Sequence, residues 1–470
     1  MTIQFCGAAR QVTGSSHLIT LDNGTKILLD CGLNQGDDEF SGKKSEQKNN
    51  NDQWYFTPSE IDCMVLSHAH VDHCGRLPKL VQDGFVGKIF CTHATKNLGA
   101  IMLLDSAAIQ ESDFQYRTRK YPKQTQRPPL FTAASVKKTM SQITSINYEE
   151  WTTIADGVEI LLRDMGHILG SASVTLRISE NGKKTVLGFT ADIGRPNRPI
   201  LRDPLPMPEV DFLICESTYG DKLHQNAPDE LDGFLQVIID TCITKKGKLI
   251  IPAFSMGRTQ ELVYMLDRLF EAGRLPAIPI YVDSPMAVEA TQIFELHPEC
   301  YDYEIHAYML EYPDPFGFRG LTYIRDVEQS KSLNTRPEPC IIISASGMAS
   351  SGRIVHHLFN NVSDEKNTVL IVGYCGHGTL GNALQSQPET VEIMHKIVPL
   401  KANVVSLHSF SAHGDQAEML AVIRNQIPTL KKLFLVHGEY ETQQVFSAYL
   451  QKNGFTCLIE IPDMGDVVAL

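Results

Sequence analysis

Short apolar runs recur along the chain, each bounded by glycine, proline, asparagine or aspartate, and this pattern predicts β-strands. The first two runs, at 11–21 and 26–30, flank the turn Asp22-Asn23-Gly24, so we expect a hairpin that ends at Asp30. The remaining strands are predicted at 61–66, 159–165, 184–190, 212–215, 248–252, 278–283, 340–344, 368–373, 404–407 and 432–436.

Helical patterns separate many of the predicted strands, for example at 76–84, 259–272 and 416–425. This alternation of strands and helices is typical of a layered α/β architecture. A chain of 470 residues is long enough for two or three domains, or for one domain that carries a large insertion. Residues 34–56 are mostly polar, which predicts a surface loop around Asn49.

The composition is that of a soluble globular protein, with 43% hydrophobic and 21% charged residues. No apolar stretch of about 18 residues occurs, and the first residues lack the features of a signal peptide. We therefore expect neither membrane association nor secretion. The eleven cysteines are scattered and form no Cys-x-x-Cys motif, which indicates a reducing compartment, and we expect the protein to be cytoplasmic.

The net charge of −13 argues against a protein that binds duplex nucleic acid through a broad, positively charged surface. It leaves room for a local basic surface. One segment combines two tyrosines with five basic residues: Tyr116, Arg117, Arg119, Lys120, Tyr121, Lys123 and Arg127. A solvated charged face and an RNA-contacting surface explain this segment equally well.

The segment after the predicted strand at 61–66 concentrates metal-binding side chains. It reads Ser67-His68-Ala69-His70-Val71-Asp72-His73, and imidazole nitrogen and carboxylate oxygen are ready ligands for zinc. Beyond a strand end, the first two histidines can point to one side of a turn while Asp72 and His73 point to the other. One loop can therefore serve two metal ions, an arrangement that surface or core histidines seldom produce by chance.

Further ligands are expected at the ends of other strands that reach the same edge. His167 follows the predicted strand at 159–165, and Asp192 follows the one at 184–190. Taken alone, either would more often be an ordinary loop residue than a ligand. Because the first cluster needs partners from elsewhere in the chain, we interpret both as ligands.

These residues resemble the zinc-binding pattern of the metallo-β-lactamase fold. In that family a His-x-His-x-Asp-His loop, a later histidine and a later aspartate hold two zinc ions, and the later aspartate bridges them. The resemblance assigns these roles to the loop from His68 to His73, to His167 and to Asp192. It also implies that Asp30 orients a zinc ligand by hydrogen bonding, although a simple turn aspartate would give the same pattern.

Three later segments resemble motifs A, B and C of the β-CASP nucleases, in the expected order: 213–220, 409–415 and 435–439. The resemblance implies that Glu216 of motif A hydrogen-bonds His413 of motif B, whose imidazolium protonates the leaving oxygen or steadies the phosphate. The implied ligands are His68, His70 and His167 for one zinc ion and Asp72, His73 and His437 of motif C for the other, with Asp192 shared.

A histidine at motif C accompanies RNA-processing members of the family, so His437 points to RNA rather than DNA. The implied reaction is hydrolysis of single-stranded RNA by a hydroxide between the two zinc ions, which leaves a 5′-phosphate and a 3′-hydroxyl. Manganese accepts the same ligands less tightly. Internal cleavage and cleavage from the 5′ end both stay open, as do a monomer and a homodimer.

A serine- and glycine-rich segment, Ile342 to Met348, resembles the region that contacts phosphate in this family. Small hydroxyls and free backbone N–H groups suit an anion at a strand-to-helix turn. An ordinary turn would use the same residue types. The implied phosphate-binding residues are Ser344, Ser346, Gly347, Arg353 and, from motif B, Ser411.

The resemblance implies a metallo-β-lactamase αβ/βα four-layer sandwich built from residues 1–208 and 396–470, with a β-CASP α/β cap domain inserted at 209–395. The active site is expected in the cleft between the two domains. Two other functions stay open: a small-ester or thioester hydrolase on the same zinc scaffold, and a non-catalytic subunit of an RNA-processing complex. The first would need neither the insertion nor motifs B and C, and the second typically loses metal ligands, which are all present here.

Overall fold

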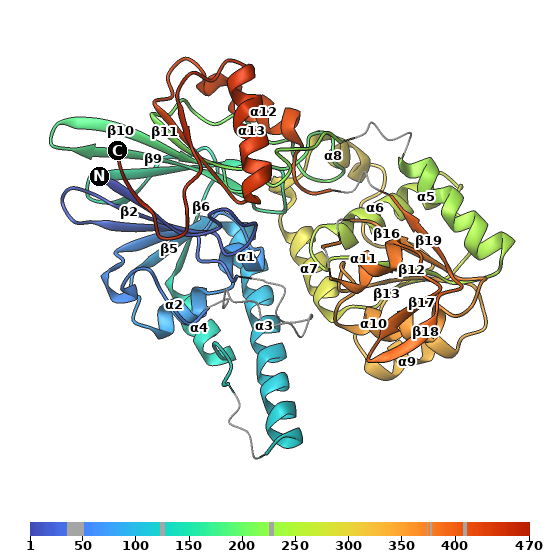
Figure 1. The fold of residues 1–470 in the computed structure, drawn as a ribbon. Helices are drawn as coiled ribbons and strands as arrows, with labels where there is room; N and C mark the ends of the chain where they lie inside the picture. The colour runs from blue at the N-terminus through green and yellow to red at the C-terminus, as the bar shows by residue number, and fades with distance from the viewer. Residues whose placement is uncertain (35–50, 123–126, 225–229, 374, 377, 408–410) are drawn as a thin grey trace. The chain divides into compact units, whose positions relative to one another are not determined.

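The computed structural model describes residues 1–34, 51–122, 127–224, 230–373, 375–376, 378–407 and 411–470 (Figure 1). The polar loop predicted around Asn49 lies largely outside these ranges, as do Lys123 of the basic segment and Ser409 and Phe410 of motif B. Contacts divide the chain into two compact units. Unit 1 comprises the described residues up to Leu223 and from Ala412 onward, and unit 2 those from His224 to Ser411. No helix in the described ranges is long and apolar enough to cross a membrane.

Unit 1 is built on two seven-stranded sheets, with the strand orders β22-β1-β2-β3-β4-β5-β6 and β21-β20-β11-β10-β9-β8-β7. The strands of the first sheet are β1 (Thr2–Gly7), β2 (Ser16–Thr20), β3 (Lys26–Leu29), β4 (Cys63–Val65), β5 (Lys88–Thr92), β6 (Ile143–Ile146) and β22 (Val467–Ala469). Those of the second are β7 (Thr152–Ala155), β8 (Val158–Asp164), β9 (Ala172–Glu180), β10 (Lys183–Phe189), β11 (Phe212–Glu216), β20 (Lys432–Val436) and β21 (Leu458–Glu460).

The apolar clusters of unit 1 define four layers. One cluster joins the facing sides of the two sheets, where the ring centroids of Phe5 in β1 and Phe434 in β20 lie 5.2 Å apart. Two further clusters pack helices against the outer sides of the first and the second sheet. These helices are α1 (Val71–Cys74), α2 (Leu77–Gln82), α3 (His93–Lys120) and α4 (Ala133–Gln142) on one side, and α12 (Gln416–Ile423) and α13 (Tyr440–Lys452) on the other. The predicted αβ/βα sandwich is therefore confirmed.

Unit 2 contains a six-stranded sheet in the order β14-β13-β15-β12-β16-β19, in which all pairs are parallel, and a hairpin of β17 and β18. The central strands β12, β15 and β16 are buried at every position, as is typical of parallel strands covered on both faces. The strands are β12 (Leu249–Pro252), β13 (Ile280–Val282), β14 (Leu321–Tyr323), β15 (Ile341–Ser344), β16 (Thr368–Ile371), β17 (Thr390–Ile393), β18 (Lys396–Pro399) and β19 (Asn403–Ser406). The helices are α5 (Glu230–Ile238), α6 (Arg258–Glu271), α7 (Pro285–Leu296), α8 (Tyr303–Met309), α9 (Val327–Thr335), α10 (Arg353–Asn361) and α11 (Leu380–Gln385).

Both boundaries of unit 2 lie later in the chain than the predicted positions 209 and 395. Strand β11 pairs with β10 and β20 and so completes a sheet of unit 1. Strand β19 pairs with β16 and so belongs to the sheet of unit 2. Each strand belongs with the sheet that satisfies its backbone hydrogen bonds, and this pairing is not visible in the composition of the sequence.

Unit 1 differs from the prediction in several elements, since the strands β1, β5, β6, β7 and β9 were not predicted. The run at 11–21 is a strand only over Ser16–Thr20, because the chain before it bends, with positive φ at Ala8 and Arg10. The bend places the carbonyl oxygen of Ala8 where it accepts a hydrogen bond from the backbone N–H of His437, at 2.7 Å. The sequence pattern also missed α3, a helix of 28 residues that extends well beyond the sheets of unit 1 (Figure 1).

Candidate metal centre

All seven predicted metal ligands lie in unit 1, where strands from both sheets end close together. The loop after β4 and the short helix α1 supply four of them from the first sheet. The second sheet supplies the others, because His167, Asp192 and His437 follow β8, β10 and β20. Four segments that are separate in the sequence therefore meet at one place.

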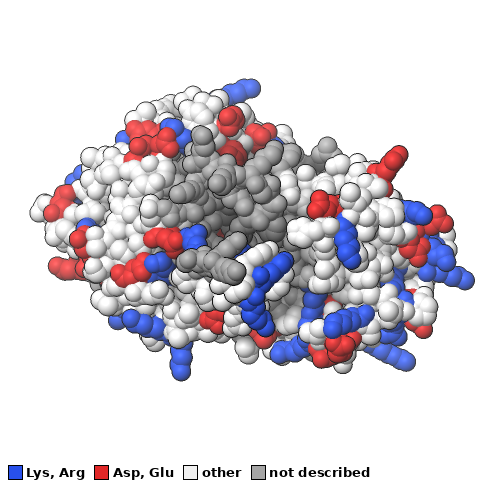
Figure 2. All heavy atoms as spheres, turned by 60° about the horizontal axis from the view of Figure 1, so that its bottom comes forward, with Lys and Arg blue, Asp and Glu red and all other residues white. Residues whose placement is uncertain are grey.

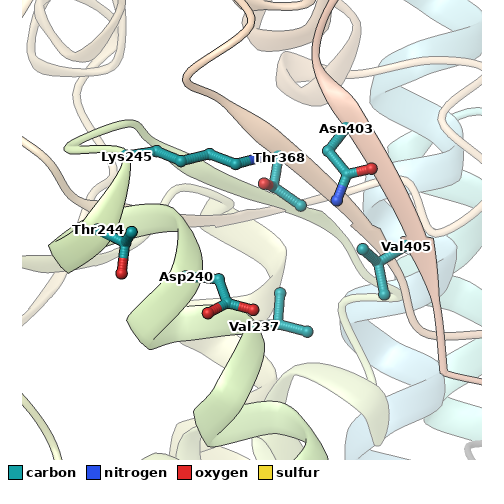
Figure 3. A pocket seen from close by; sticks show the side chains of 7 residues that line it. All are labelled: Val237, Asp240, Thr244, Lys245, Thr368, Asn403 and Val405. Carbon is teal, nitrogen blue, oxygen red and sulfur yellow. The ribbon is translucent and has the colours of Figure 1, made fainter.

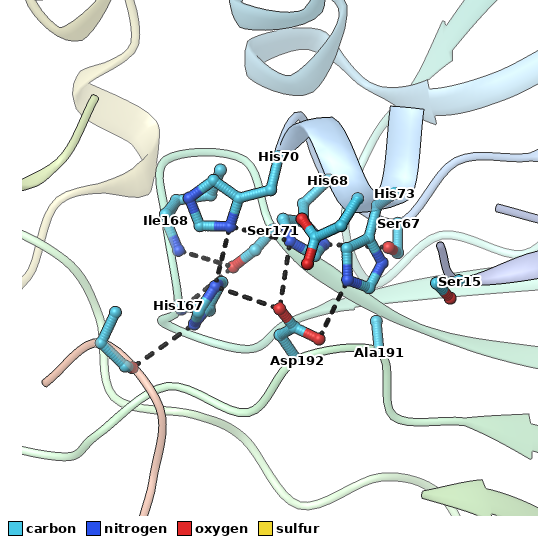
Figure 4. A network of polar contacts seen from close by, with 12 residues as sticks. Ser15, Ser67, His68, His70, His73, His167, Ile168, Ser171, Ala191 and Asp192 are labelled. Atoms are coloured by element: carbon cyan, nitrogen blue, oxygen red, sulfur yellow. Dashed lines mark hydrogen bonds and ion pairs between the residues drawn. The ribbon is translucent and has the colours of Figure 1, made fainter. Parts of the chain in front are cut away.

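The first group of candidate ligands consists of His68, His70, His167 and Asp192 (Figure 4). Nδ1 of His70 lies 3.2 Å from Nε2 of His68 and 3.1 Å from Nε2 of His167. Oδ2 of Asp192 lies 3.4 Å from Nε2 of His68 and 3.3 Å from Nε2 of His167. Three imidazole nitrogens and one carboxylate oxygen thus converge on a small buried volume.

The second group consists of Asp72, His73 and His437. The Nε2 atoms of His73 and His437 lie 3.2 Å apart, and Oδ2 of Asp72 lies 3.5 Å from Nε2 of His437. Oδ1 of Asp192 lies 3.2 Å from Nε2 of His73 and 3.7 Å from Nε2 of His437. The two oxygens of Asp192 therefore face different groups, which is the geometry that a bridging carboxylate requires.

The electrostatics of the first group favour neutral imidazoles. Burial lowers the pKa of His68, His70 and His167, that of His70 to about 3. A neutral imidazole has a free nitrogen lone pair and is the form that binds metal. Asp192 stays ionised although burial opposes its charge, because the imidazoles of His437 and His73 in the second group hold its pKa well below the usual range.

Hydrogen-bond partners outside the two groups fix the ring orientations. Asp30 is fully buried, and its Oδ2 lies 2.7 Å from Nδ1 of His73, which leaves Nε2 of that ring free toward Asp192. Burial alone would lower the pKa of His73, but the carboxylates of Asp192 and Asp30 raise it well above its usual value. The backbone N–H and the hydroxyl of Ser67 also donate to Asp30, at 2.8 and 2.9 Å.

The sequence did not identify the partners of the other rings. The hydroxyl of Thr218 lies 3.0 Å from Nδ1 of His437, and that of Ser67 lies 3.0 Å from Nδ1 of His68. The carbonyl oxygen of Ala412 lies 3.4 Å from Nδ1 of His167. Such partners fix the tautomer and the direction of a ligating imidazole. The signal available for Thr218 was its place in motif A, two residues after Glu216.

Glu216 and His413 form a pair beside the two groups. Oε1 of Glu216, which is 1% exposed, lies 3.2 Å from Nδ1 of His413. Nε2 of His413 lies 3.9 Å from Oδ2 of Asp192. Burial opposes a charge on His413, but the carboxylates of Glu216 and Asp192 raise the pKa of His413 to about 9. The pair therefore keeps a proton on His413 at neutral pH.

The predicted phosphate-binding residues all lie in unit 2 and are largely engaged with other protein groups. The hydroxyl of Ser344 is buried and donates to the carbonyl oxygen of Asp283 at 2.8 Å. Arg353 donates to Oδ1 of Asp283 at 2.6 Å and to a backbone carbonyl. A phosphate contact in which the hydroxyl of Ser344 donates would require its bond to Asp283 to break, whereas Arg353 has further N–H groups beyond these bonds.

The other members of this set differ in their surroundings. The hydroxyl of Ser346 is buried and has no hydrogen-bond partner among the described residues. The backbone of Gly347 lies against the ring of Phe254, so close that a Cβ atom there would come within 2.6 Å of it. Ser411 is partly buried at the end of unit 2. These positions therefore remain predictions as phosphate contacts.

Unit 2 also contains a cavity of about 340 Å³ (Figure 3). It lies beside the π-helical segment Ile239–Thr244, at the amino-terminal ends of β16 and β19. Ligands of parallel α/β sheets bind at the opposite, carboxyl edge. The cavity is lined by Val237, Asp240, Thr244, Lys245, Thr368, Asn403 and Val405, none of which is a predicted site residue.

Three family models match successive parts of the chain. A metallo-beta-lactamase superfamily domain matches residues 18–189, and a Beta-Casp domain matches residues 259–384. A Zn-dependent metallo-hydrolase RNA specificity domain matches residues 397–460. The first match contains the loop from His68 to His73 and His167, and the third contains His413 and His437.

Comparison with characterised proteins gives relatives along nearly the whole chain. Ribonuclease TTHA0252 of Thermus thermophilus is 34% identical over 95% of this chain and 95% of its own length. Transcription termination factor FttA of Methanocaldococcus jannaschii is 31% identical over 93% of this chain and 67% of its own. Cleavage and polyadenylation specificity factor 73 of Drosophila melanogaster is 31% identical over 96% of this chain and 62% of its own. The chain belongs to the Beta-Casp family of the metallo-β-lactamase superfamily.

Proposed function

We propose that this protein is a zinc-dependent ribonuclease that hydrolyses phosphodiester bonds of single-stranded RNA with two zinc ions. Two comparisons support the substrate: the match to an RNA specificity domain and the likeness to a protein named a ribonuclease. The position of Asp192 carries the proposal of two ions, because its carboxylate oxygens face separate groups of nitrogen and oxygen donors.

The residues present fit a pair of zinc ions. Imidazole nitrogens of different residues face one another at 3.1 to 3.2 Å, so each contact needs either a shared proton or a cation that both lone pairs bind. Oδ1 of Asp192 is buried and accepts no hydrogen bond from any described residue. Donor sets of imidazole and carboxylate with room for further ligands are typical of catalytic zinc.

The proposed chemistry divides between the metal and the protein. Zinc in such a centre lowers the pKa of water and stabilises negative charge on a phosphate. Asp30, Ser67 and Thr218 hold the histidine rings in the direction that binding requires. Glu216 holds His413 protonated, so that Nε2 can donate its proton to the leaving oxygen. The side chain of His413 is 20% exposed, which leaves it accessible to a substrate.

The test is a time course of RNA cleavage by the purified full chain, with 5′-end-labelled and internally labelled single strands, with and without a chelator. We expect cleavage that the chelator abolishes and that added zinc restores. Release of labelled mononucleotide from the 5′ end would indicate exonuclease action, and fragments of intermediate length would indicate internal cleavage. Hydrolysis of a thioester without any cleavage of RNA would contradict the proposal and favour the small-molecule hydrolase.

A further inference from the structure

The C-terminal end of α3 is a basic and aromatic surface that the rest of unit 1 leaves uncovered. Every residue from Gln115 to Lys120 is exposed, and the side chains of Tyr116 and Tyr121 are 54% and 44% exposed. We call Tyr116, Arg117, Arg119, Lys120 and Tyr121 the basic arm. Figure 2 brings this end of the helix forward and shows Lys and Arg side chains gathered near the centre of that face.

The charge of the arm is opposite to that of the whole chain. Between Phe114 and Tyr148 the sequence contains seven basic residues and no Asp or Glu, although the net charge of the chain is −13. Among the described residues, Arg117 and Arg119 form no ion pair with a carboxylate. The Lys120 ammonium group donates a hydrogen bond to the hydroxyl of Tyr116, at 2.9 Å. The described carboxylates therefore do not neutralise the positive charge of Arg117 and Arg119.

Basic residues near the end of a helix interact favourably with the helix dipole, which would account for a cation in the last turn. That interaction does not account for the two exposed tyrosines. The Lys120 ammonium lies 5.1 Å from the ring centroid of Tyr116 and 5.4 Å from that of Tyr121. Exposed aromatic rings interleaved with cations are typical of surfaces that bind single-stranded nucleic acid, since unpaired bases stack on the rings while the cations contact phosphates.

We propose that the basic arm binds a single-stranded part of the RNA substrate away from the metal centre, an inference that rests on the proposed ribonuclease function. Helix α3 starts at the metal centre, because the hydroxyls of Thr92 and Thr95 donate to the carbonyl oxygen of Gly170, in the loop that carries His167, at 2.7 and 2.8 Å. From His93 to Arg117 the helix rises about 36 Å, which corresponds to about ten nucleotides of a stacked strand. RNA long enough to reach both places should therefore bind more tightly than short RNA.

The experiment compares two variants of the full chain that carry the same charge. One is R117Q/R119Q/K120Q, and the control is K88Q/K183Q/K184Q, which removes three exposed lysines elsewhere on unit 1. Each changes the net charge from −13 to −16, since three positive charges are lost. Fluorescence anisotropy with a chelator present measures the affinity for labelled oligouridylates of 5 and 30 nucleotides as a function of salt.

We expect the arm variant to bind the 30-mer about 10- to 100-fold more weakly at 0.1 M salt, and the slope of log K against log salt to fall by about 2, because each phosphate contact contributes about 0.7. The 5-mer should bind the arm variant and the unmodified protein equally. The control variant should bind both oligonucleotides like the unmodified protein.

Equal binding of the 30-mer by the arm variant and the control would overturn the inference, and so would equal losses for the two oligonucleotides. Cleavage of RNA by the unmodified protein alongside either result would leave the proposed function intact. A second variant, Y116L/Y121L, keeps the charge and tests the stacking. It should weaken binding of the 30-mer without changing the salt slope, and an unchanged affinity would contradict the assignment of the tyrosines.

Discussion

At the scale of single residues, the side chain of Asp192 lies between the two groups of candidate metal ligands. Because each oxygen faces a different group of imidazoles, Asp192→Asn should weaken both sites at once. We expect zinc content to fall from two ions to fewer than one per chain, and RNA cleavage to fall to background. Metal analysis of the purified variants measures this, with Asp156→Asn in an exposed turn as the control. Retention of two zinc ions by the Asp192 variant would contradict the bridging role.

His413 should act on turnover without affecting metal binding. His413→Ala removes the proposed proton donor, so we expect kcat to fall by about 10²- to 10⁴-fold while zinc content stays unchanged. A parallel loss of zinc would show that His413 is a ligand instead. The pH profile gives a second measurement. The pKa of His413 is raised to about 9 and a catalytic acid works only while protonated, so kcat should fall as the pH rises through that value.

The variant Glu216→Gln tests why the pKa of His413 is raised. Glu216 is the carboxylate that contributes most to raising the pKa of His413. Without its charge, the fall in kcat should begin at a lower pH than in the unmodified protein. An unchanged pH profile would show that Glu216 does not control the protonation of His413.

Asp267 in α6 offers a test of stability away from the metal centre. Its carboxylate is buried, accepts a hydrogen bond from the hydroxyl of Tyr308 at 2.7 Å, and has its pKa raised to about 6 by burial. Folding therefore favours the protonated form, and this contribution is present below the unfolded pKa of about 3.9 and lost as the pH rises through 6. Asp267→Asn should raise the denaturant midpoint at pH 7 and change it little at pH 4. A lower midpoint at pH 7 would contradict this reasoning.

The sequence led us to predict the metal ligands and one orienting group, Asp30, but not the partners Ser67 and Thr218 of the other rings. The spacing of His68, His70, Asp72 and His73 restricts the chemistry strongly, because few other reasons place these side chains so close together. A hydroxyl such as that of Thr218 can serve many roles, and its contact with a histidine depends on how two distant strands align. Residue type alone therefore does not predict which hydroxyl contacts which histidine.

At the scale of elements, close packing of backbone holds the ligand loops in place. Gly194, which follows Asp192, is so close to the loop of His167 that a Cβ atom would lie 2.2 Å from the carbonyl oxygen of Gly166. Gly194→Ala must therefore displace that loop, and we expect a loss of zinc and a lower melting temperature. Gly99→Ala is the matched control, because nothing lies within 4 Å of its Cβ position in α3, and alanine should stabilise that helix by about 1 kcal/mol. Normal zinc content in the Gly194 variant would contradict this reading.

Strands were more predictable than helices in this chain. The buried parallel strands β12, β15 and β16 are continuous apolar runs because no position along them faces water. Helix α3 gave no such signal, since its last turns are polar and exposed on every side. In the sequence, its exposed end appeared only as a cluster of basic and aromatic residues. The structure places this cluster at the C-terminal end of α3.

At the scale of the whole molecule, the family resemblance predicted the layered sandwich and the insertion, while the boundaries depended on strand pairing. Strands β11 and β19 lie near the ends of the insertion, and either could have joined the sheet of either unit on composition alone. The net charge of the chain likewise does not reveal how charge is distributed over the structure. A total of −13 describes the chain as a whole and conceals the basic arm.

We propose that RNA cleavage by this chain depends on two zinc ions held in unit 1. The most direct measurement is a titration of metal-free protein with zinc while the initial rate of cleavage of internally labelled single-stranded RNA is followed. We expect no cleavage without metal and a rate that rises to a plateau at two equivalents of zinc per chain. Cleavage by the metal-free protein, or a plateau at one equivalent, would contradict this proposal.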